Sequence, residues 1–264
     1  MNILYSIFLG VVQGLTEFLP VSSSGHIVLF QKIFGISEGA MAFNIAVHIA
    51  TLVAVVFIFW KEIWYMIRHP FSKITLLVIT ATIPTAIVGF AFRDFFEYAF
   101  ASGQFIGISF ITTGVILLLA DKFHSQTHYG KDLDNVSYMD AILVGVAQCV
   151  AVMPAISRSG VTIFAGLFRG LKKESAIKFS FLMSVPAILG PAIVDAQNLT
   201  TEMFYSIGAL PIFFGMITAG VTGYFSIRFM LDLFSRASFK GFAYYVFILG
   251  ALILTDQFFF GIFF

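Results

Sequence analysis

The sequence predicts an all-α, polytopic membrane protein: an inverted repeat of two units, each a re-entrant helical hairpin followed by three transmembrane helices. Composition is the first reason, because 59% of the 264 residues are hydrophobic and only 11% are charged, whereas soluble domains carry about 25% charged residues. The other reasons are a set of long apolar segments and a pair of interrupted segments that resemble each other. A net charge of +1 gives no reason to expect a nucleic-acid partner.

Six apolar segments are long enough to cross a bilayer as helices, which takes about 17–25 residues. They cover residues 43–60, 74–92, 104–120, 176–194, 204–227 and 242–262. We therefore expect six spanning helices, three in each half of the chain.

Two further apolar regions, residues 3–34 and 138–169, are each interrupted by a stretch rich in Pro, Ser and Gly. The arms after the breaks, Ile27–Phe34 and Val161–Phe168, are too short to span a bilayer. Broken backbone at membrane depth is tolerated only where protein or a wet cavity surrounds it. Each region is therefore predicted to be a hairpin that enters and leaves the membrane on one side.

The two interrupted regions also repeat one another, with seven identities at a fixed offset of 135 positions. We infer one domain over residues 1–264, with repeat one at 1–121 and repeat two at 138–264. Because an odd number of spanning helices separates the hairpins, the second repeat would be inverted, with a site where the repeats meet.

The distribution of Lys and Arg favours this topology. With re-entrant hairpins, Lys32 and Arg93 fall on one side of the membrane, twelve cationic residues fall on the other, and Arg158 lies inside the second hairpin. With single crossings the division would be five against nine. The positive-inside rule makes the side with twelve cytoplasmic, so the first hairpin is predicted to open to the extracytoplasmic side.

The first break, within Gln13–His26, carries polar groups that are costly in hydrocarbon and normally face a cavity or a partner. Gln13 and Glu17 lie one helical turn apart and project from the same face. Glu17 could hold a divalent cation or act as an acid or base, and Mg²⁺ prefers one or two carboxylates together with substrate phosphate. For Gln13, a role in the site and a role in helix packing are equally expected. His26 is suited to move a proton, and the serines Ser22, Ser23 and Ser24 offer a nucleophile.

Each hairpin re-enters a helix after a Ser-x-Ser-Gly turn, Ser22–Gly25 in the first and Ser157–Gly160 in the second. Serine caps helix N-termini, and glycine lets the backbone approach a ligand closely. In an inverted repeat the two helix N-termini would face each other and form a site for an anion such as phosphate. Arg158 adds a guanidinium fork that fits phosphate oxygens, the alternative being a purely structural pair with Glu17. The candidate substrate-binding residues are Gln13, Ser22, Ser24, Gly25, Ser157, Ser159 and Gly160.

Other polar residues are weaker candidates. His48 lies one turn after Asn44 in a spanning segment, where a helix–helix contact is favoured over a role in the site. The remaining histidines, His69, His124 and His128, fall in predicted loops. A cationic group, Arg169, Lys172 and Lys173, is predicted to face anionic lipid and to fix the topology.

At these residues the sequence resembles the undecaprenyl-pyrophosphate phosphatase family, also known for bacitracin resistance, over essentially its whole length. The motifs that carry the resemblance are Gln13–His26, Thr80–Pro84, Pro154–Gly160 and Phe179–Pro186. The chain departs from the family where Gln13 stands, since the family often has Glu there. It departs again at Ala155, where the family usually has Gly.

The resemblance implies an enzyme of the bacterial inner membrane that removes the terminal phosphate from a polyprenyl diphosphate on the extracytoplasmic side, with Mg²⁺ or Ca²⁺. This would recycle the lipid carrier for cell-wall synthesis. Glu17 and Arg158 would then hold the cation and the diphosphate, with Ser23 attacking and His26 carrying the proton. Attack by His26 or by an activated water stays open. The alternative function is a polyprenyl-phosphate flippase or an anion transporter, because transporters also use inverted repeats and broken helices. A homodimer is compatible with the sequence.

Overall fold

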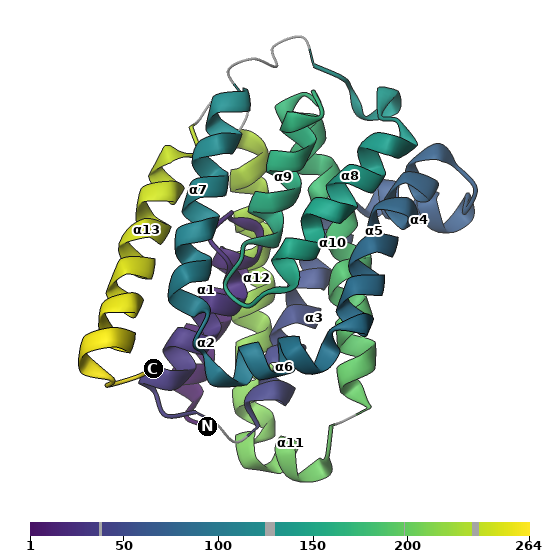
Figure 1. The fold of residues 1–264 in the computed structure, drawn as a ribbon. Helices are drawn as coiled ribbons and strands as arrows, with labels where there is room; N and C mark the ends of the chain where they lie inside the picture. Colours follow the sequence, from purple (N-terminus) through teal and green to yellow (C-terminus); the bar gives the residue numbers. More distant parts are fainter. Residues whose placement is uncertain (37–38, 125–129, 198, 234–237) are drawn as a thin grey trace.

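The computed structural model describes residues 1–36, 39–124, 130–197, 199–233 and 238–264, and within these ranges the chain is helical without β-strands. Six of the helices are long and apolar enough to cross a membrane. They are α3 (Ala40–Ile58), α5 (Lys73–Ala91), α7 (Ile106–His124), α10 (Lys173–Ala196), α12 (Ala209–Leu233) and α13 (Lys240–Thr255), the last of which continues as a π-helical turn to Phe260. They form an elongated bundle (Figure 1). The six predicted spanning segments are thus confirmed as helices, and the chain is a multi-pass membrane protein.

One predicted segment, residues 204–227, is divided in the structure. The short helix α11 (Thr201–Ile207) ends at Gly208, whose φ of +90° lies in the left-handed region that favours glycine, and α12 begins directly afterwards. Two further short helices, α4 (Trp60–Arg68) and α6 (Arg93–Ser102), lie in stretches that the sequence analysis left without structure. Both carry charged residues beside aromatic ones, which explains why a search for apolar segments passes over them.

The two interrupted regions form hairpins with short second arms. The first pairs α1 (Ile3–Phe18) with α2 (Ser23–Ile33), and the second pairs α8 (Tyr138–Gln148), extended by a 3₁₀ turn, with α9 (Arg158–Phe168). Each second arm has 11 residues, or about 16 Å of helix at 1.5 Å per residue. That is about half the hydrocarbon thickness of a bilayer, about 30 Å. In Figure 1, α1 starts at the lower end of the bundle and α8 at the upper end.

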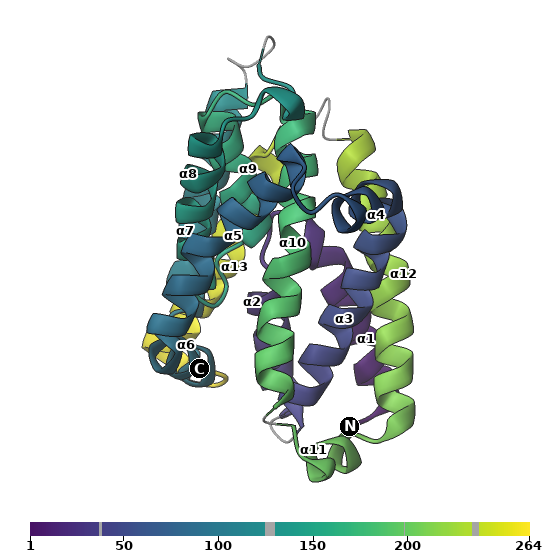
Figure 2. The ribbon, with the colours of Figure 1, turned by 90° about the vertical axis from the view of Figure 1, so that its right-hand side faces the viewer.

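The hairpins pack reciprocally on the spanning helices of the opposite half. Helix α1 lies along α12, and α8 lies along α5, while α7 and α13 pair with each other (Figures 1 and 2). A glycine permits each close approach: a Cβ at Gly10 would overlap the carbonyl oxygen of Gly215, and a Cβ at Gly145 would overlap that of Ala81. This exchange of partners fits two related halves. An inverted symmetry between them stays a prediction.

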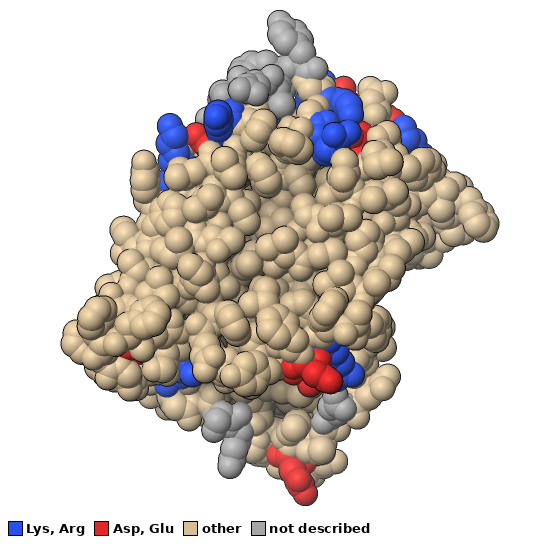
Figure 3. Space-filling view, in the orientation of Figure 1, with Lys and Arg blue, Asp and Glu red and all other residues tan. Residues whose placement is uncertain are grey.

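Charged side chains gather at the two ends of the molecule and leave a broad uncharged band between them, with most Lys and Arg at one end (Figure 3). Arg169 and Lys172 lie at this end but pair with acidic residues, Asp140 and Asp132, each at 2.9 Å. Lys173 differs from the expectation of a lipid-facing cation. It is 5% exposed, and its ammonium lies over a phenylalanine ring, because it starts α10 inside the bundle.

Candidate active site

The two hairpin turns meet in the middle of the bundle and are bonded to each other. Ser24 Oγ in the first hairpin accepts a hydrogen bond from the backbone N–H of Ala155 at 3.2 Å. Ser159 Oγ in the second donates to the carbonyl oxygen of Leu19 at 3.3 Å. Each turn therefore uses the serine before its glycine to bind the backbone of the other turn, so the two helix starts are held in one place.

Both re-entering helices begin at a serine cap, as the sequence predicts. Ser22 Oγ accepts from the N–H of Gly25 at 3.4 Å, and Ser157 Oγ accepts from the N–H of Gly160 at 3.1 Å. The caps satisfy one backbone donor at each helix start. Ser22 itself has a φ of +71°, a left-handed conformation that costs free energy in residues with a side chain.

The second turn contains a left-handed residue of its own at Ala155, with a φ of +64°. This conformation explains why glycine is expected at that position. The side chain of Ala155 faces Gly25, where an added Cβ would lie only 2.6 Å from the Ala155 Cβ. Gly25 thus accommodates the alanine, and the closeness of the two turns depends on this glycine.

Glu17 is the centre of the polar cluster at this junction. It is 8% exposed, and Oε1 accepts from Arg158 Nη2 at 2.7 Å. Oε2 accepts from Ser23 Oγ at 2.6 Å and from Gln13 Nε2 at 3.0 Å. Four predicted site residues, drawn from both hairpins, therefore converge on one another.

Two polar atoms in this cluster are buried without a hydrogen-bond partner among the described residues: Gln13 Oε1, an acceptor, and Arg158 Nη1, a donor. Leaving a buried polar group unsatisfied costs about 1–3 kcal/mol, so such atoms call for an explanation. An anion beside Arg158 and a cation or its water beside Gln13 would satisfy both. The cluster thus leaves one acceptor and one donor without partners, as expected of a site that binds a ligand.

These residues fit a divalent cation that is shared with the substrate. Glu17 and Gln13 supply a carboxylate and an amide oxygen, ligands that Mg²⁺ and Ca²⁺ accept. Within the described parts of the chain, no group of three His, Cys, Asp or Glu side chains could hold a metal. A cation here would need phosphate oxygens or water as its other ligands, which suits Mg²⁺ in phosphate chemistry.

His26 lies at the same junction but is bonded differently from the expectation. It is 2% exposed; Nδ1 donates to the carbonyl oxygen of Ser22 at 2.6 Å, and Nε2 lies 2.7 Å from the hydroxyl oxygen of Tyr245. The hydroxyl of Ser23 is bonded to Glu17 and not to the imidazole. In this geometry Glu17, rather than His26, is placed to receive a proton from Ser23.

The structure adds two residues that the sequence analysis did not place in the site. His48 Nε2 lies 3.7 Å from Glu17 Oε2, so this histidine belongs to the site rather than to a remote helix contact. Its Nδ1 bonds the carbonyl oxygen of Asn44. The spacing of one turn between Asn44 and His48 was visible in the sequence, but the proximity of His48 to Glu17 was not. The second added residue is Tyr245, which no pattern in the sequence marks as part of the site.

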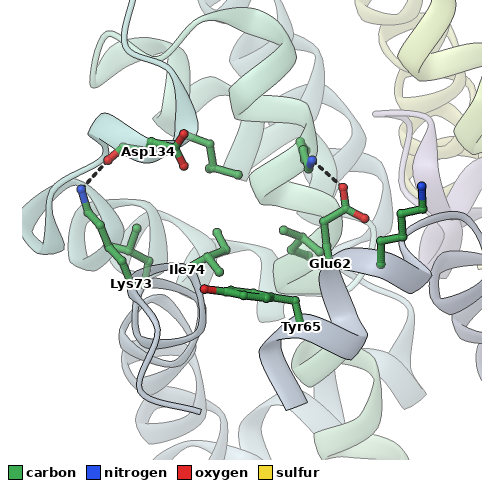
Figure 4. Close-up of a pocket in the computed structure, with 10 residues that line it drawn as sticks. Glu62, Tyr65, Lys73, Ile74 and Asp134 are labelled. Carbon is green, nitrogen blue, oxygen red and sulfur yellow. Dashed lines mark hydrogen bonds and ion pairs between the residues drawn. The ribbon is translucent and has the colours of Figure 1, made fainter. Parts of the chain in front are cut away.

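A pocket lies apart from this junction, between α4, α5 and α10 (Figure 4), with a volume of about 300 Å³. Two of its lysines already have partners: Lys178 donates to Glu62 at 2.6 Å, and Lys73 donates to the carbonyl oxygen of Asp134. Burial raises the pKa of Glu62, but the hydrogen bond and charge of Lys178 outweigh this and leave the pKa below its ordinary value. In the part of the chain that the structure describes, no histidine or serine lines this pocket, which makes the hairpin junction the better candidate.

The fold and the junction together define a multi-pass helical membrane protein with a buried, phosphate-compatible site between two broken hairpins. The family model described as bacitracin resistance protein BacA matches residues 6–252, and the chain belongs to this family. A protein of Carboxydothermus hydrogenoformans named undecaprenyl-diphosphatase is 48% identical over 259 residues, which cover 97% of this chain and 98% of that protein.

Two further relatives also match over nearly the full length of both chains. A Bacillus cereus protein named undecaprenyl-diphosphatase 4 is 44% identical and covers 98% of both chains. A Methanobrevibacter smithii protein named undecaprenyl-diphosphatase is 38% identical, covering 97% of this chain and 98% of its own. The resemblance noted in the sequence is thereby confirmed over nearly the whole chain.

Proposed function

We propose that the protein hydrolyses undecaprenyl diphosphate, or a closely related polyprenyl diphosphate, to the monophosphate and orthophosphate. The observation that carries the proposal is the buried Ser23–Glu17–Arg158 arrangement with an unsatisfied guanidinium nitrogen. It combines a hydroxyl, a carboxylate and a phosphate-binding cation within hydrogen-bond distance of one another. The names of the relatives agree with this assignment.

Arg158 is the residue that recognises the diphosphate. Its Nη2 is held by Glu17, which fixes the plane of the guanidinium, and Nη1 is left to donate to a phosphate oxygen. The N-termini of α2 and α9 add backbone dipoles that favour an anion. A divalent cation, held by Glu17 and Gln13, would neutralise part of the charge on the diphosphate.

Ser23 is the nucleophile in the route that the geometry favours. Its Oγ forms a bond to the terminal phosphorus while the bond from phosphorus to the bridging oxygen breaks, and Glu17 accepts the hydroxyl proton. Polyprenyl phosphate leaves, and a water then releases orthophosphate from the serine. In the competing route, water attacks directly and Ser23 only orients it.

The membrane setting follows from the substrate. The diphosphate would enter the polar junction while the isoprenoid tail stays among lipid-facing apolar side chains. We propose that the site opens to the extracytoplasmic side of the bacterial plasma membrane, as the bias of cationic residues predicts. Hydrolysis there would return the carrier lipid to cell-wall synthesis.

The test is phosphate release from a polyprenyl diphosphate by purified protein in lipid nanodiscs, with and without added Mg²⁺ or Ca²⁺. We expect metal-dependent turnover that Ser23→Ala lowers by at least about 10²-fold, as for loss of a nucleophile. Phosphoserine at position 23, trapped by rapid acid quench, would identify the covalent route. Transport of the lipid without phosphate release would contradict the proposal.

A further inference from the structure

The hydrogen bonds of His26 restrict which of its atoms can exchange a proton. A carbonyl oxygen only accepts, so Nδ1, 2.6 Å from the oxygen of Ser22, carries a hydrogen. Nε2 of the neutral ring is then the acceptor. The atom 2.7 Å from it is the hydroxyl oxygen of Tyr245, which must be the donor. Both nitrogens are therefore engaged, and only Nε2 can take up a proton.

Tyr245 also covers the imidazole and is far more exposed than it. His26 is 2% exposed, whereas Tyr245, on α13, is 47% exposed. The phenol ring stacks on the imidazole with a centroid distance of 5.6 Å and an interplanar angle of 12°. Phe110 of α7 covers the imidazole from another direction, edge to face at 5.2 Å. Among the described residues, the Tyr245 hydroxyl is the one polar group bonded to Nε2.

We propose that Tyr245 is a proton-relay residue that positions His26 and connects its Nε2 to the reaction; this proposal rests on the proposed function. When the water of the second step attacks the phosphoserine, it gives a proton to the phenol oxygen while the phenol's own proton passes to Nε2, so the phenol stays neutral and the imidazole carries the charge. The reverse transfer returns that proton to the orthophosphate that leaves; the proton of Ser23 passes to Glu17 and does not enter this relay. No oxidant or further reactant is needed, and the atoms balance.

The relay gives His26 a role even though this residue does not contact the nucleophile. Ser23 is bonded to Glu17, so His26 is not needed to orient the nucleophile. An imidazole buried at the same junction, with one nitrogen fixed by the backbone and the other by a phenol, is instead arranged for the water of the second step. In the proposed relay, Tyr245 links the imidazole to that water.

The test uses Tyr245→Phe, which removes one oxygen atom and keeps the stacked ring. We expect kcat for phosphate release to fall about 10–100-fold, below the range typical of losing a direct acid or base, with KM changed less than about twofold. Tyr244→Phe is the matched control, because Tyr244 is the preceding residue of α13 and is 59% exposed. It should retain the wild-type kcat.

Two measurements separate a relay from a packing role. In a double-mutant cycle, Tyr245→Phe should lower kcat no further in a His26→Ala background, because both changes break one pathway. In ¹⁵N NMR of histidine-labelled protein, the Nε2 signal of His26 should move in Tyr245→Phe and stay in place in Tyr244→Phe. The NMR result does not depend on turnover.

The possible outcomes separate failure of the relay from failure of the proposed function. A Tyr245→Phe protein with the wild-type kcat overturns the relay and leaves the proposed function standing, as does a loss that adds fully to that of His26→Ala. An unmoved Nε2 signal overturns the hydrogen bond on which the relay depends. A folded wild-type protein that releases no phosphate overturns the proposed function and the relay with it.

Discussion

The two hairpin turns have the same construction and different chemistry. In both, a serine caps the re-entering helix through the N–H of a glycine three residues on, and a second serine bonds the opposite turn. Yet one turn is preceded by Glu17 and followed by His26, whereas the second has Val152 and Val161 at the corresponding positions. The second turn contributes Arg158, whose counterpart in the first is a serine.

The backbone frame and the reacting groups are therefore separable. The frame, two capped helix starts bonded to each other, holds phosphate-compatible N–H groups in either hairpin. The reacting groups are divided, with the carboxylate and imidazole on one hairpin and the guanidinium on the other. The ion pair between Glu17 and Arg158 at 2.7 Å is where the halves become one site.

The largest expected effect comes from the first turn. Glu17→Gln removes the proton acceptor of Ser23, a cation ligand and the partner of Arg158, so phosphate release should fall about 10³-fold, within the range for lost acid–base catalysis. Steady-state phosphate release in nanodiscs measures it. Glu62→Gln, which changes a carboxylate in the pocket between α4, α5 and α10, is the control and should keep the wild-type rate. Equal losses in both variants would contradict the assignment of the site.

The second turn should respond to a more conservative change. Arg158→Lys keeps the positive charge but loses the planar fork that binds Glu17 and phosphate together, so kcat/KM should fall about 10²-fold, as when a transition-state donor is lost. The same assay, run over a range of substrate concentrations, measures it. Arg68→Lys, at an exposed arginine over a tryptophan ring, should be silent. An Arg158→Lys enzyme as active as the wild type would show that the guanidinium geometry is unimportant.

Alanine at the two turn glycines tests how closely the turns approach. A Cβ at Gly25 would lie 2.6 Å from both the Ala155 Cβ and a ring atom of Phe110, while one at Gly160 meets its nearest atoms at 3.2 Å. Gly25→Ala should therefore lower the free energy of unfolding by about 1–3 kcal/mol, the usual cost of overpacking, and Gly160→Ala by less. Thermal unfolding in detergent compares them. The reverse order would mean that the turns are not in contact as described.

The smallest effect lies outside both turns, at Glu62 and Lys178. Because the pKa of Glu62 is lower in the folded protein than its ordinary 4.5, the pair stabilises the fold above that value. The contribution is lost as pH falls through the folded pKa. Solvent screening of this partly exposed pair keeps its contribution below about 1 kcal/mol. Unfolding followed from pH 6 downward should show a slightly steeper loss in the wild type than in Glu62→Gln; identical profiles would exclude the contribution.

Local sequence was sufficient to predict much of this architecture. Apolar length identified the six spanning helices, and the two Ser-x-Ser-Gly breaks identified the hairpins, because capping and chain reversal are local properties. The convergence of Glu17 and Arg158 followed from the repeat. The limits were equally physical: α4 and α6 are amphipathic rather than apolar, and Gly208 interrupts a run that hydropathy alone reads as continuous.

The two site residues that the sequence did not reveal, Tyr245 and His48, were missed for the same reason. Tyr245 lies 219 positions from His26, and nothing in its neighbourhood on α13 distinguishes it from a lipid-facing tyrosine. His48 was visible as a polar residue in a spanning segment, but only the packing of α3 beside α1 brings it near Glu17. Contacts between distant helices that the repeat does not relate were therefore the part that one sequence could not supply.

The most direct test of the account is a structure of the protein with a non-hydrolysable polyprenyl diphosphate analogue, such as a methylene bisphosphonate, in a lipid nanodisc with Mg²⁺. We predict that the terminal phosphate contacts Arg158 Nη1, with its phosphorus facing Ser23 Oγ and the isoprenoid tail leading to the lipid. A diphosphate bound elsewhere, with Arg158 still paired only to Glu17, would contradict the claim that the two turns form one phosphatase site.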